Sequence, residues 1–259
     1  MNRRVLLLII GSLLLPLGCD DPTGPSAFCS DHPDTAIATF EDANLEAAIR
    51  AALSVGAQED LTCGLISGLT ELEAVNLGIT SLIGVQNLTG LTNLNLGGNS
   101  ISDISALGGL TNLTYLSLRN NYSINDIGPL SGLTNLTSLN LHSNSISDIG
   151  PPLTGLTSLT YLDLGETSIS DISALSGLTG LTVLYLDNNS ISDISALSGL
   201  TSLERLDLDN NPNLTDIQPL LDNAGLGAGD TVYLQATSVS CADVAALQAK
   251  GVSVESDCP

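Results

Sequence analysis

The chain has 259 residues, a formal net charge of −22 at pH 7, five cysteines and no tryptophan. Removal of Arg3 and Arg4 with an export signal would take the charge to −24 and leave four basic residues. A chain this acidic repels phosphate backbones and anionic lipid, which excludes nucleic-acid binding and membrane binding through surface charge.

Residues 1–18 have the features of a secretory signal, with a basic start and an apolar run over residues 5–17 that is too short to span a bilayer. Gly18 and Cys19 resemble the end of a bacterial lipoprotein cleavage site, although Pro16 stands where that pattern usually has leucine. The resemblance implies that Cys19 becomes the lipidated first residue. We therefore expect an exported protein, lipid-anchored in the bacterial envelope at the outer membrane, the cell surface or the periplasmic face. An ordinary signal peptide is the alternative.

Residues 19–36 are rich in proline and aspartate and are expected to form a flexible tether. Residues 37–68 are expected to form an N-terminal cap, in which Phe40–Leu53 is predicted to be a helix. Thr39 or Asp42 is available as its N-cap. The apolar stripe of this helix consists of Leu45, Ile49 and Leu53.

Residues 69–223 contain seven copies of one unit of about 22 residues. The core of the unit is LxxLxLxxN, as in Leu113 to Asn121, and its apolar and polar residues alternate as in a strand with one buried face. Apolar residues then recur at steps of three, which favours a 3₁₀-like turn. One copy buries too few aliphatic side chains to offset the entropy of ordering its backbone, so the copies must stack. The copies begin at Leu69, Leu88, Leu110, Leu133, Leu156, Leu178 and Leu200.

This core resembles the leucine-rich repeat, and the phrase ISDISAL resembles the internalin branch of that family. The resemblance covers roughly residues 37–245. It implies an α/β solenoid, a leucine-rich-repeat horseshoe with a parallel β-sheet on the concave face, a 3₁₀ or irregular convex side and a helical N-terminal cap. It also implies adhesion or recognition. Host-cell invasion is not implied, because only the cap and the repeats match. The phrase occurs at residues 101–107, 169–175 and 191–197.

Two polar residues recur once per copy. The asparagine of the core is expected to stack as a ladder that satisfies backbone groups, with Thr167 interrupting and loosening it. Each aspartate is expected to cap the turn that follows it, with calcium binding as the alternative, also for Asp207, Asp209 and Asn211. The asparagines are Asn99, Asn121, Asn144, Asn189 and Asn211. The aspartates are Asp103, Asp126, Asp148, Asp171, Asp193 and Asp216.

Residues 224–259 are expected to form a C-terminal cap with a last strand at Thr231–Gln235 and a helix at Ala242–Ala249. With Cys19 used as the anchor, four cysteines remain in an exported chain, which allows three disulfide pairings. Because two cysteines flank each end of the repeats, we predict Cys29 with Cys63 and Cys241 with Cys258. A zinc site at Cys29 and His32 is a rival that lacks the usual paired spacing.

The variable positions beside the middle leucine of each core point away from the interior and form two columns on the concave face. One column is predicted to be Asn76, Asn95, Ser117, Asn140, Asp163, Tyr185, Asp207 and Tyr233. The other is predicted to be Ala74, Asn93, Tyr115, Ser138, Tyr161, Val183, Arg205 and Thr231. Exposed aromatic residues beside charges are typical of interface centres, although tyrosine also simply suits strands. The predicted binding residues are Tyr115, Tyr161, Asp163, Tyr185, Asp187, Arg205, Asp207 and Tyr233.

The sequence therefore predicts a monomeric, non-enzymatic binding module without a cofactor, whose partner is a protein with a basic surface. A passive envelope protein is the alternative, favoured by the monotony of the repeats. An enzyme is a remote third, because Ser117 and Ser143 have no evident base and His142 is the only histidine in the repeats.

Overall fold

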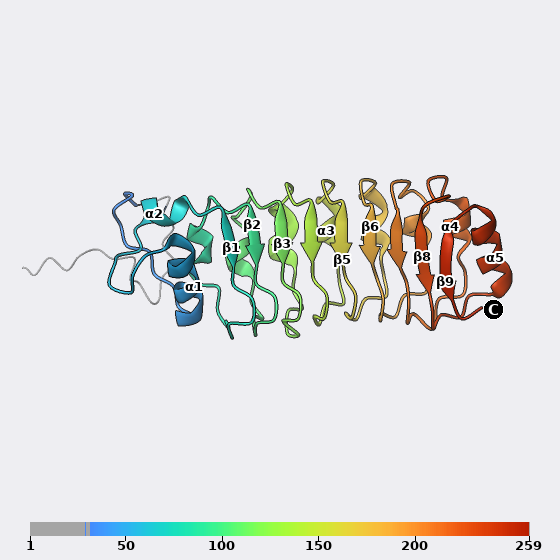
Figure 1. Cartoon of the computed structure of the whole chain (residues 1–259), viewed down its shortest axis with the longest axis horizontal. Coiled ribbons are helices and arrows are strands. Elements are labelled where there is room, and N and C mark those ends of the chain that lie inside the picture. The colour runs from blue at the N-terminus through green and yellow to red at the C-terminus, as the bar shows by residue number, and fades with distance from the viewer. Residues whose placement is uncertain (1–28, 30–31, 259) are drawn as a thin grey trace, which may run out of the picture.

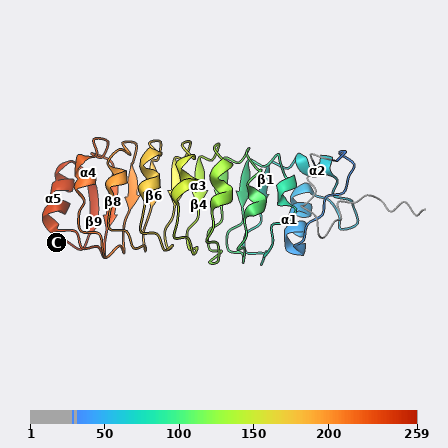
Figure 2. The ribbon, with the colours of Figure 1, turned by 180° about the vertical axis from the view of Figure 1, so that it is seen from behind.

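In the computed structural model, which describes Cys29 and residues 32–258, the chain forms one elongated coil (Figures 1 and 2). The coil carries one parallel sheet of nine strands in the order β1 to β9. The predicted horseshoe of stacked copies is therefore confirmed, with one or two strands more than the repeats predicted. The strands are β1 (Glu71–Glu73), β2 (Asn93–Asn95), β3 (Tyr115–Ser117), β4 (Ser138–Asn140), β5 (Tyr161–Asp163), β6 (Val183–Tyr185), β7 (Arg205–Asp207), β8 (Thr231–Leu234) and β9 (Ser253–Ser256).

The return segments lie behind the sheet and are short, as the three-residue steps predict (Figure 2). Most are 3₁₀ turns, and two are single α-helical turns. The 3₁₀ turns are η2 (Val85–Asn87), η3 (Ser105–Leu107), η4 (Gly128–Gly132), η5 (Ser173–Gly177) and η6 (Ser195–Leu197). The α-helical turns are α3 (Gly150–Thr154) and α4 (Gln218–Asp222). Between sheet and turns, the repeated leucines and isoleucines form one continuous buried core.

The predicted asparagine ladder joins neighbouring copies. Asn121 Nδ2 donates to the carbonyls of Leu96 (3.2 Å) in the previous copy and Leu118 (2.8 Å) in its own, and its Oδ1 accepts from Ile101 N–H at 3.0 Å. At the interruption, Thr167 Oγ1 lies 2.9 Å from the Leu164 carbonyl and 2.7 Å from Asn189 Oδ1. The hydroxyl thus replaces part of the missing amide, and local loosening stays a prediction.

The predicted turn caps are also present. In each of six copies the aspartate Oδ1 accepts a hydrogen bond of 2.8 Å from the backbone N–H two residues later, as Asp171 does from Ser173. This bond lowers the pKa of Asp171 and of Asp193.

The N-terminal cap contains α1 (Ala43–Leu53) and α2 (Cys63–Ser67), of which only α1 is predicted by the sequence. Asp42 is the N-cap, with Oδ1 accepting from Asn44 N–H (2.9 Å) and Leu45 N–H (3.1 Å). Burial alone would raise the pKa of Asp42, but these bonds and those from Thr80 and Ser81 lower it. The predicted disulfide between Cys29 and Cys63 is formed.

The C-terminal cap contains β8, α5 (Cys241–Ala249) and β9. The prediction that β8 is the last strand is wrong, because β9 follows α5 and pairs with β8 in parallel. The second predicted disulfide, between Cys241 and Cys258, ties the start of α5 to the segment after β9. No helix among the described residues is long and apolar enough to cross a bilayer.

The predicted signal, lipidation site and most of the tether lie outside the described residues. They include Cys19.

Candidate functional site

The sheet presents one row of side chains on each side of its buried central residues. We call this surface, made by the first and third residues of β1 to β8, the sheet face. Parallel pairing places Tyr115, Tyr161 and Arg205 in the first column, and Tyr185, Asp207 and Tyr233 in the second, as predicted. All six are half-buried, so each offers part of its side chain to solvent.

The predicted columns are wrong in the first copy. Glu71 pairs with Asn93 and Glu73 with Asn95, so these two glutamates occupy the positions that we assigned to Ala74 and Asn76. Ala74 is fully buried and takes the place of the third leucine of the core. The first copy is thus in a different register from the one the sequence suggested, and the early end of the sheet face is more acidic.

A cluster of four side chains from β5 to β8 stands out on the sheet face. The Tyr161 and Tyr185 ring centroids are 5.9 Å apart with the planes tilted by 56°. The guanidinium carbon of Arg205 lies 5.5 Å from the Tyr185 ring centroid and 4.6 Å from that of Tyr233. We call Tyr161, Tyr185, Arg205 and Tyr233 the tyrosine–arginine cluster. The rings and the guanidinium hold one another in place, since stacked cations and aromatic groups attract.

Carboxylates surround this cluster. Burial raises the pKa of Asp207 to about 6, and nearby Asp209 and Asp187 add to the effect. Burial also raises the pKa of Asp209, although its Oδ1 accepts a bond from Gln235 N–H at 2.6 Å. These groups carry negative charge in a partly desolvated place, which favours a cationic partner.

Asp163 departs from its predicted role as an exposed contact. It is 9% exposed, and its oxygens accept bonds from Asn140 Nδ2 (3.0 Å) and Gly165 N–H (3.1 Å). His142 Nδ1 lies 3.5 Å from Oδ1. Burial raises the pKa of Asp163 and, together with Asp163 itself, raises the pKa of Tyr161 to about 12. Asp163 is therefore held by Asn140 and Gly165 beside His142, and its charge acts on nearby Tyr161.

Sequence reasoning gave no role to His142 and Tyr122. His142 lies on the loop after β4, with Nε2 3.7 Å from Glu166 Oε2, and adds an imidazole to the rim of the sheet face. Tyr122 is 67% exposed and directly follows Asn121. It is the one residue by which this 23-residue copy exceeds the usual 22 residues. The unequal copy length is the signal that identifies such an insertion.

The arrangement lacks the parts of a nucleophilic site. Buried Ser143 donates its Oγ proton to Glu166 at 2.6 Å, so the hydroxyl is bonded to a carboxylate and not to the imidazole of His142. Ser117 is 2% exposed on the sheet face. A nucleophile needs a base within hydrogen-bond reach that a third group orients.

The possible calcium ligands do not converge either. Asn211 is fully buried, and its amide bonds the backbone of Leu186, Leu208 and Ile191, whereas Asp207 and Asp209 lie on the outer side. Within residues 32–258 and Cys29, no three His, Cys, Asp or Glu side chains group as metal ligands.

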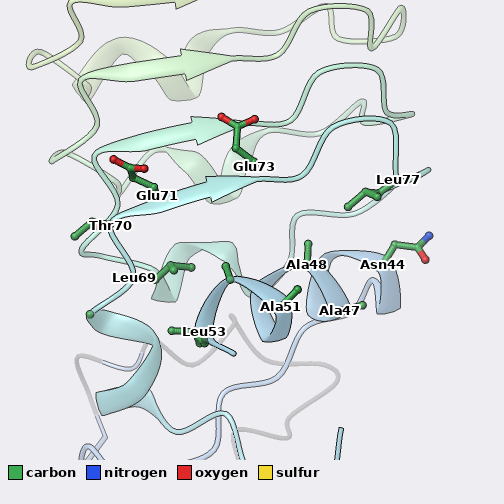
Figure 3. A pocket seen from close by; sticks show the side chains of 12 residues that line it. Asn44, Ala47, Ala48, Ala51, Leu53, Leu69, Thr70, Glu71, Glu73 and Leu77 are labelled. Atoms are coloured by element: carbon green, nitrogen blue, oxygen red, sulfur yellow. The ribbon is translucent and has the colours of Figure 1, made fainter. Parts of the chain in front are cut away.

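A hollow lies far from the tyrosine–arginine cluster, between α1 and β1 (Figure 3). It has a volume of about 940 Å³. Ala48 and Ala51 point from α1 toward β1, and Glu71 and Glu73 stand on the strand above them. Its lining contains no histidine, cysteine or lysine. The lining consists mostly of alanine and leucine side chains, with the two carboxylates on the side of β1.

The family model described as "Leucine Rich repeats (2 copies)" matches residues 89–132, 111–155, 134–177 and 179–222, which together make up just over half of the chain. The chain belongs to the leucine-rich-repeat family. Such proteins are generally protein-interaction modules, and the internalin-like fold is typically non-enzymatic.

This leucine-rich-repeat protein is similar to internalin C2 of Listeria monocytogenes, with 32% identity, a TM-score of 0.76 and coverage of 84% of this chain and 94% of that one. It is also similar to the internalin encoded by inlF of the same species, with 31% identity, a TM-score of 0.67 and coverage of 83% and 71%. A leucine-rich-repeat protein of Leptospira interrogans shares the fold, at 22% identity, a TM-score of 0.54 and coverage of 68% and 51%. No curated protein matches the chain.

The predicted internalin-like repeats are thus confirmed. The two disulfides indicate an extracytoplasmic protein, because such bonds persist in oxidising compartments.

Proposed function

We propose that this protein is a non-enzymatic binding module of the bacterial cell envelope, which recognises another protein through the sheet face of its later copies. The observation that carries the proposal is the tyrosine–arginine cluster. Tyrosine and arginine dominate the energetic centres of protein interfaces, and here four of them are pre-positioned and half-exposed beside small polar neighbours. Tyr115 and Asp187 extend the surface along the sheet.

The partner has a basic surface. The mature charge of −24 and the carboxylates of Asp187, Asp207 and Asp209 steer cationic proteins toward the sheet face and repel acidic ones. The protein acts as a monomer, since two copies of so acidic a surface repel each other.

The second candidate is a passive envelope protein without a specific partner. Three copies of ISDISAL and the recurring GLT phrase favour it, because repeats kept near a consensus need no partner to explain them. The two functions differ in whether a defined protein binds the tyrosine–arginine cluster.

Capture from envelope extracts tests the binding function. The variant Tyr161→Ser, Tyr185→Ser and Arg205→Ser should lose a partner that the unmodified protein retains. The matched control is Asn93→Ser, Asn95→Ser and Ser138→Ala, which changes the same columns in β2 and β4. Melting temperatures of both variants show whether the fold is kept. Unchanged capture by the cluster variant would contradict the proposal, and capture of no partner at all would favour the passive function.

Anchoring through Cys19 is a separate part of the proposal. A palmitate analogue fed to the producing bacterium should label the protein, and Cys19→Ala should abolish the label. A label that survives the substitution would refute the anchor without affecting the binding surface.

A further inference from the structure

Arg205 is a cation without an ion pair on an acidic surface. Within the described part of the chain, no carboxylate pairs with its guanidinium. Its Nε is buried and has no hydrogen-bond partner there. Arg205 is therefore in ion-pair contact with no carboxylate of this part of the chain, and its charge only partly offsets the rise in the pKa of nearby Asp207.

Two other basic side chains, unlike Arg205, form polar contacts within the fold. Arg50 pairs with Glu46 at 2.8 Å and donates to the carbonyls of Gly56 (2.9 Å) and Glu59 (2.7 Å). Lys250 donates to three backbone carbonyls at 2.6 to 3.0 Å. The N–H groups of Arg50 and Lys250 therefore bind acceptors within the protein, whereas the guanidinium of Arg205 has no carboxylate partner there.

Stacking explains how Arg205 stays unpaired beside Asp207. The rings of Tyr185 and Tyr233 lie on the guanidinium, at 5.5 and 4.6 Å from its central carbon. Asp207 Oδ1 instead accepts from Asp209 N–H at 3.0 Å. An arginine held between rings keeps its outer N–H groups in the guanidinium plane, where they match a carboxylate, and it loses little entropy when that carboxylate binds.

We propose that Arg205 receives a carboxylate of the partner protein, from an Asp or Glu that is flanked by Lys or Arg. The inference rests on the proposed function and specifies the partner's charge pattern. The flanking cations face Asp187, Asp209 and the outer edge of Asp207, and the central anion faces Arg205. A wholly basic segment would place a cation against Arg205, which costs specificity and affinity through like-charge repulsion.

Selection from a displayed library of random octapeptides tests the pattern. The library is selected in parallel on the unmodified protein, on Arg205→Gln, on Arg205→Lys and on Arg119→Gln. Arg119 is an exposed arginine in the loop after β3 and serves as the control. Melting temperatures establish that each variant is folded, and Arg205→Lys, which keeps the charge but not the planar fork, serves if Arg205→Gln does not fold.

The unmodified protein should enrich peptides with one Asp or Glu between basic residues, and Arg205→Gln should enrich basic peptides without it. Replacing the acid by its amide in a selected peptide should weaken binding to the unmodified protein and to Arg119→Gln about tenfold, less to Arg205→Lys, and not to Arg205→Gln.

Enrichment of purely basic peptides on the unmodified protein would overturn this inference and leave the proposed function standing. An acid that persists on Arg205→Gln would also overturn it. Enrichment of nothing on the unmodified protein would count against the inference and the proposed function together.

Discussion

Asn211 Nδ2 donates to the carbonyl oxygen of Leu186, one copy earlier in the chain, at 2.9 Å. The same amide donates to the Leu208 carbonyl (3.0 Å) and accepts from Ile191 N–H (2.9 Å), with no part of the side chain exposed. One short side chain therefore satisfies buried backbone groups of two successive copies. These hydrogen bonds join the two copies just after the strand ends.

Asn211→Ala should lower the free energy of unfolding by about 2 to 4 kcal/mol, because buried donors and acceptors lose their partners. Urea unfolding followed by circular dichroism measures the change. Asn213→Ala, at an exposed position of the same loop, should change it by less than about 0.5 kcal/mol. Equal losses would show that the ladder does not stabilise the coil.

Thr167→Asn should repair the interruption in the ladder. An asparagine there can reach the Leu141 carbonyl of the preceding copy, which the Thr167 hydroxyl does not. We expect a gain of about 1 kcal/mol in unfolding free energy, the typical net value of a hydrogen bond. Thr167→Ala should have the opposite effect. A loss of stability in Thr167→Asn would mean that the bond to Asn189 is worth more than the repaired ladder.

Asp207 should make the protein less stable as pH rises from about 4 to 6. Its folded pKa of about 6 lies above its ordinary value, so the folded state binds more protons in this interval and the unfolding free energy falls with increasing pH. Because the group is half-exposed, solvent screening limits the effect to about 1 kcal/mol.

Asp207→Asn should therefore be more stable than the unmodified protein at pH 7 and similar to it at pH 4, as measured by urea unfolding at both values. Asp193→Asn is the control of opposite sign, since a hydrogen bond from Ser195 N–H lowers the pKa of Asp193. That group contributes stability above its unfolded pKa and loses it as pH falls. Identical pH profiles for Asp207→Asn and the unmodified protein would contradict the account of Asp207.

Removal of the disulfides should destabilise the two ends of the coil. Cys241→Ser with Cys258→Ser opens a loop with a sequence separation of 17, and should cost about 3 kcal/mol of unfolding free energy. Cys29→Ser with Cys63→Ser should loosen the N-terminal cap in the same way. Hydrogen exchange should locate each loss at its own end. An effect spread evenly over the strands would contradict the role of the disulfides as end clamps.

Most of the fold can be predicted from the sequence because nearly every copy repeats the same pattern of leucines and asparagine. Alternation around Leu116 or Leu184 fixes the buried face of a strand, and equal spacing fixes the register between strands. The prediction is wrong where a copy is atypical. In the first copy Ala74 replaces a leucine and Leu77 stands where the asparagine should be. The repeat pattern therefore did not show where the strand lies, and the column positions of this copy were assigned to the wrong residues.

The candidate site is less predictable than the fold. The columns show which side chains share a face, but Arg205 and Tyr233 belong to different columns and meet only because a long side chain crosses diagonally between strands. Burial of Asp163 likewise depends on Asn140 and His142 from the neighbouring copy. Such contacts depend on rotamers, which the repeat pattern does not specify.

Photocrosslinking in the producing cells tests the binding surface most directly. A benzoylphenylalanine at position 161 on β5 should form a covalent adduct with a discrete protein. The same residue at position 192, exposed in the turn before η6, should not. Our account predicts an adduct at position 161 that disappears when Tyr185 and Arg205 are also replaced. Equal adducts at both positions, or none at position 161, would contradict it.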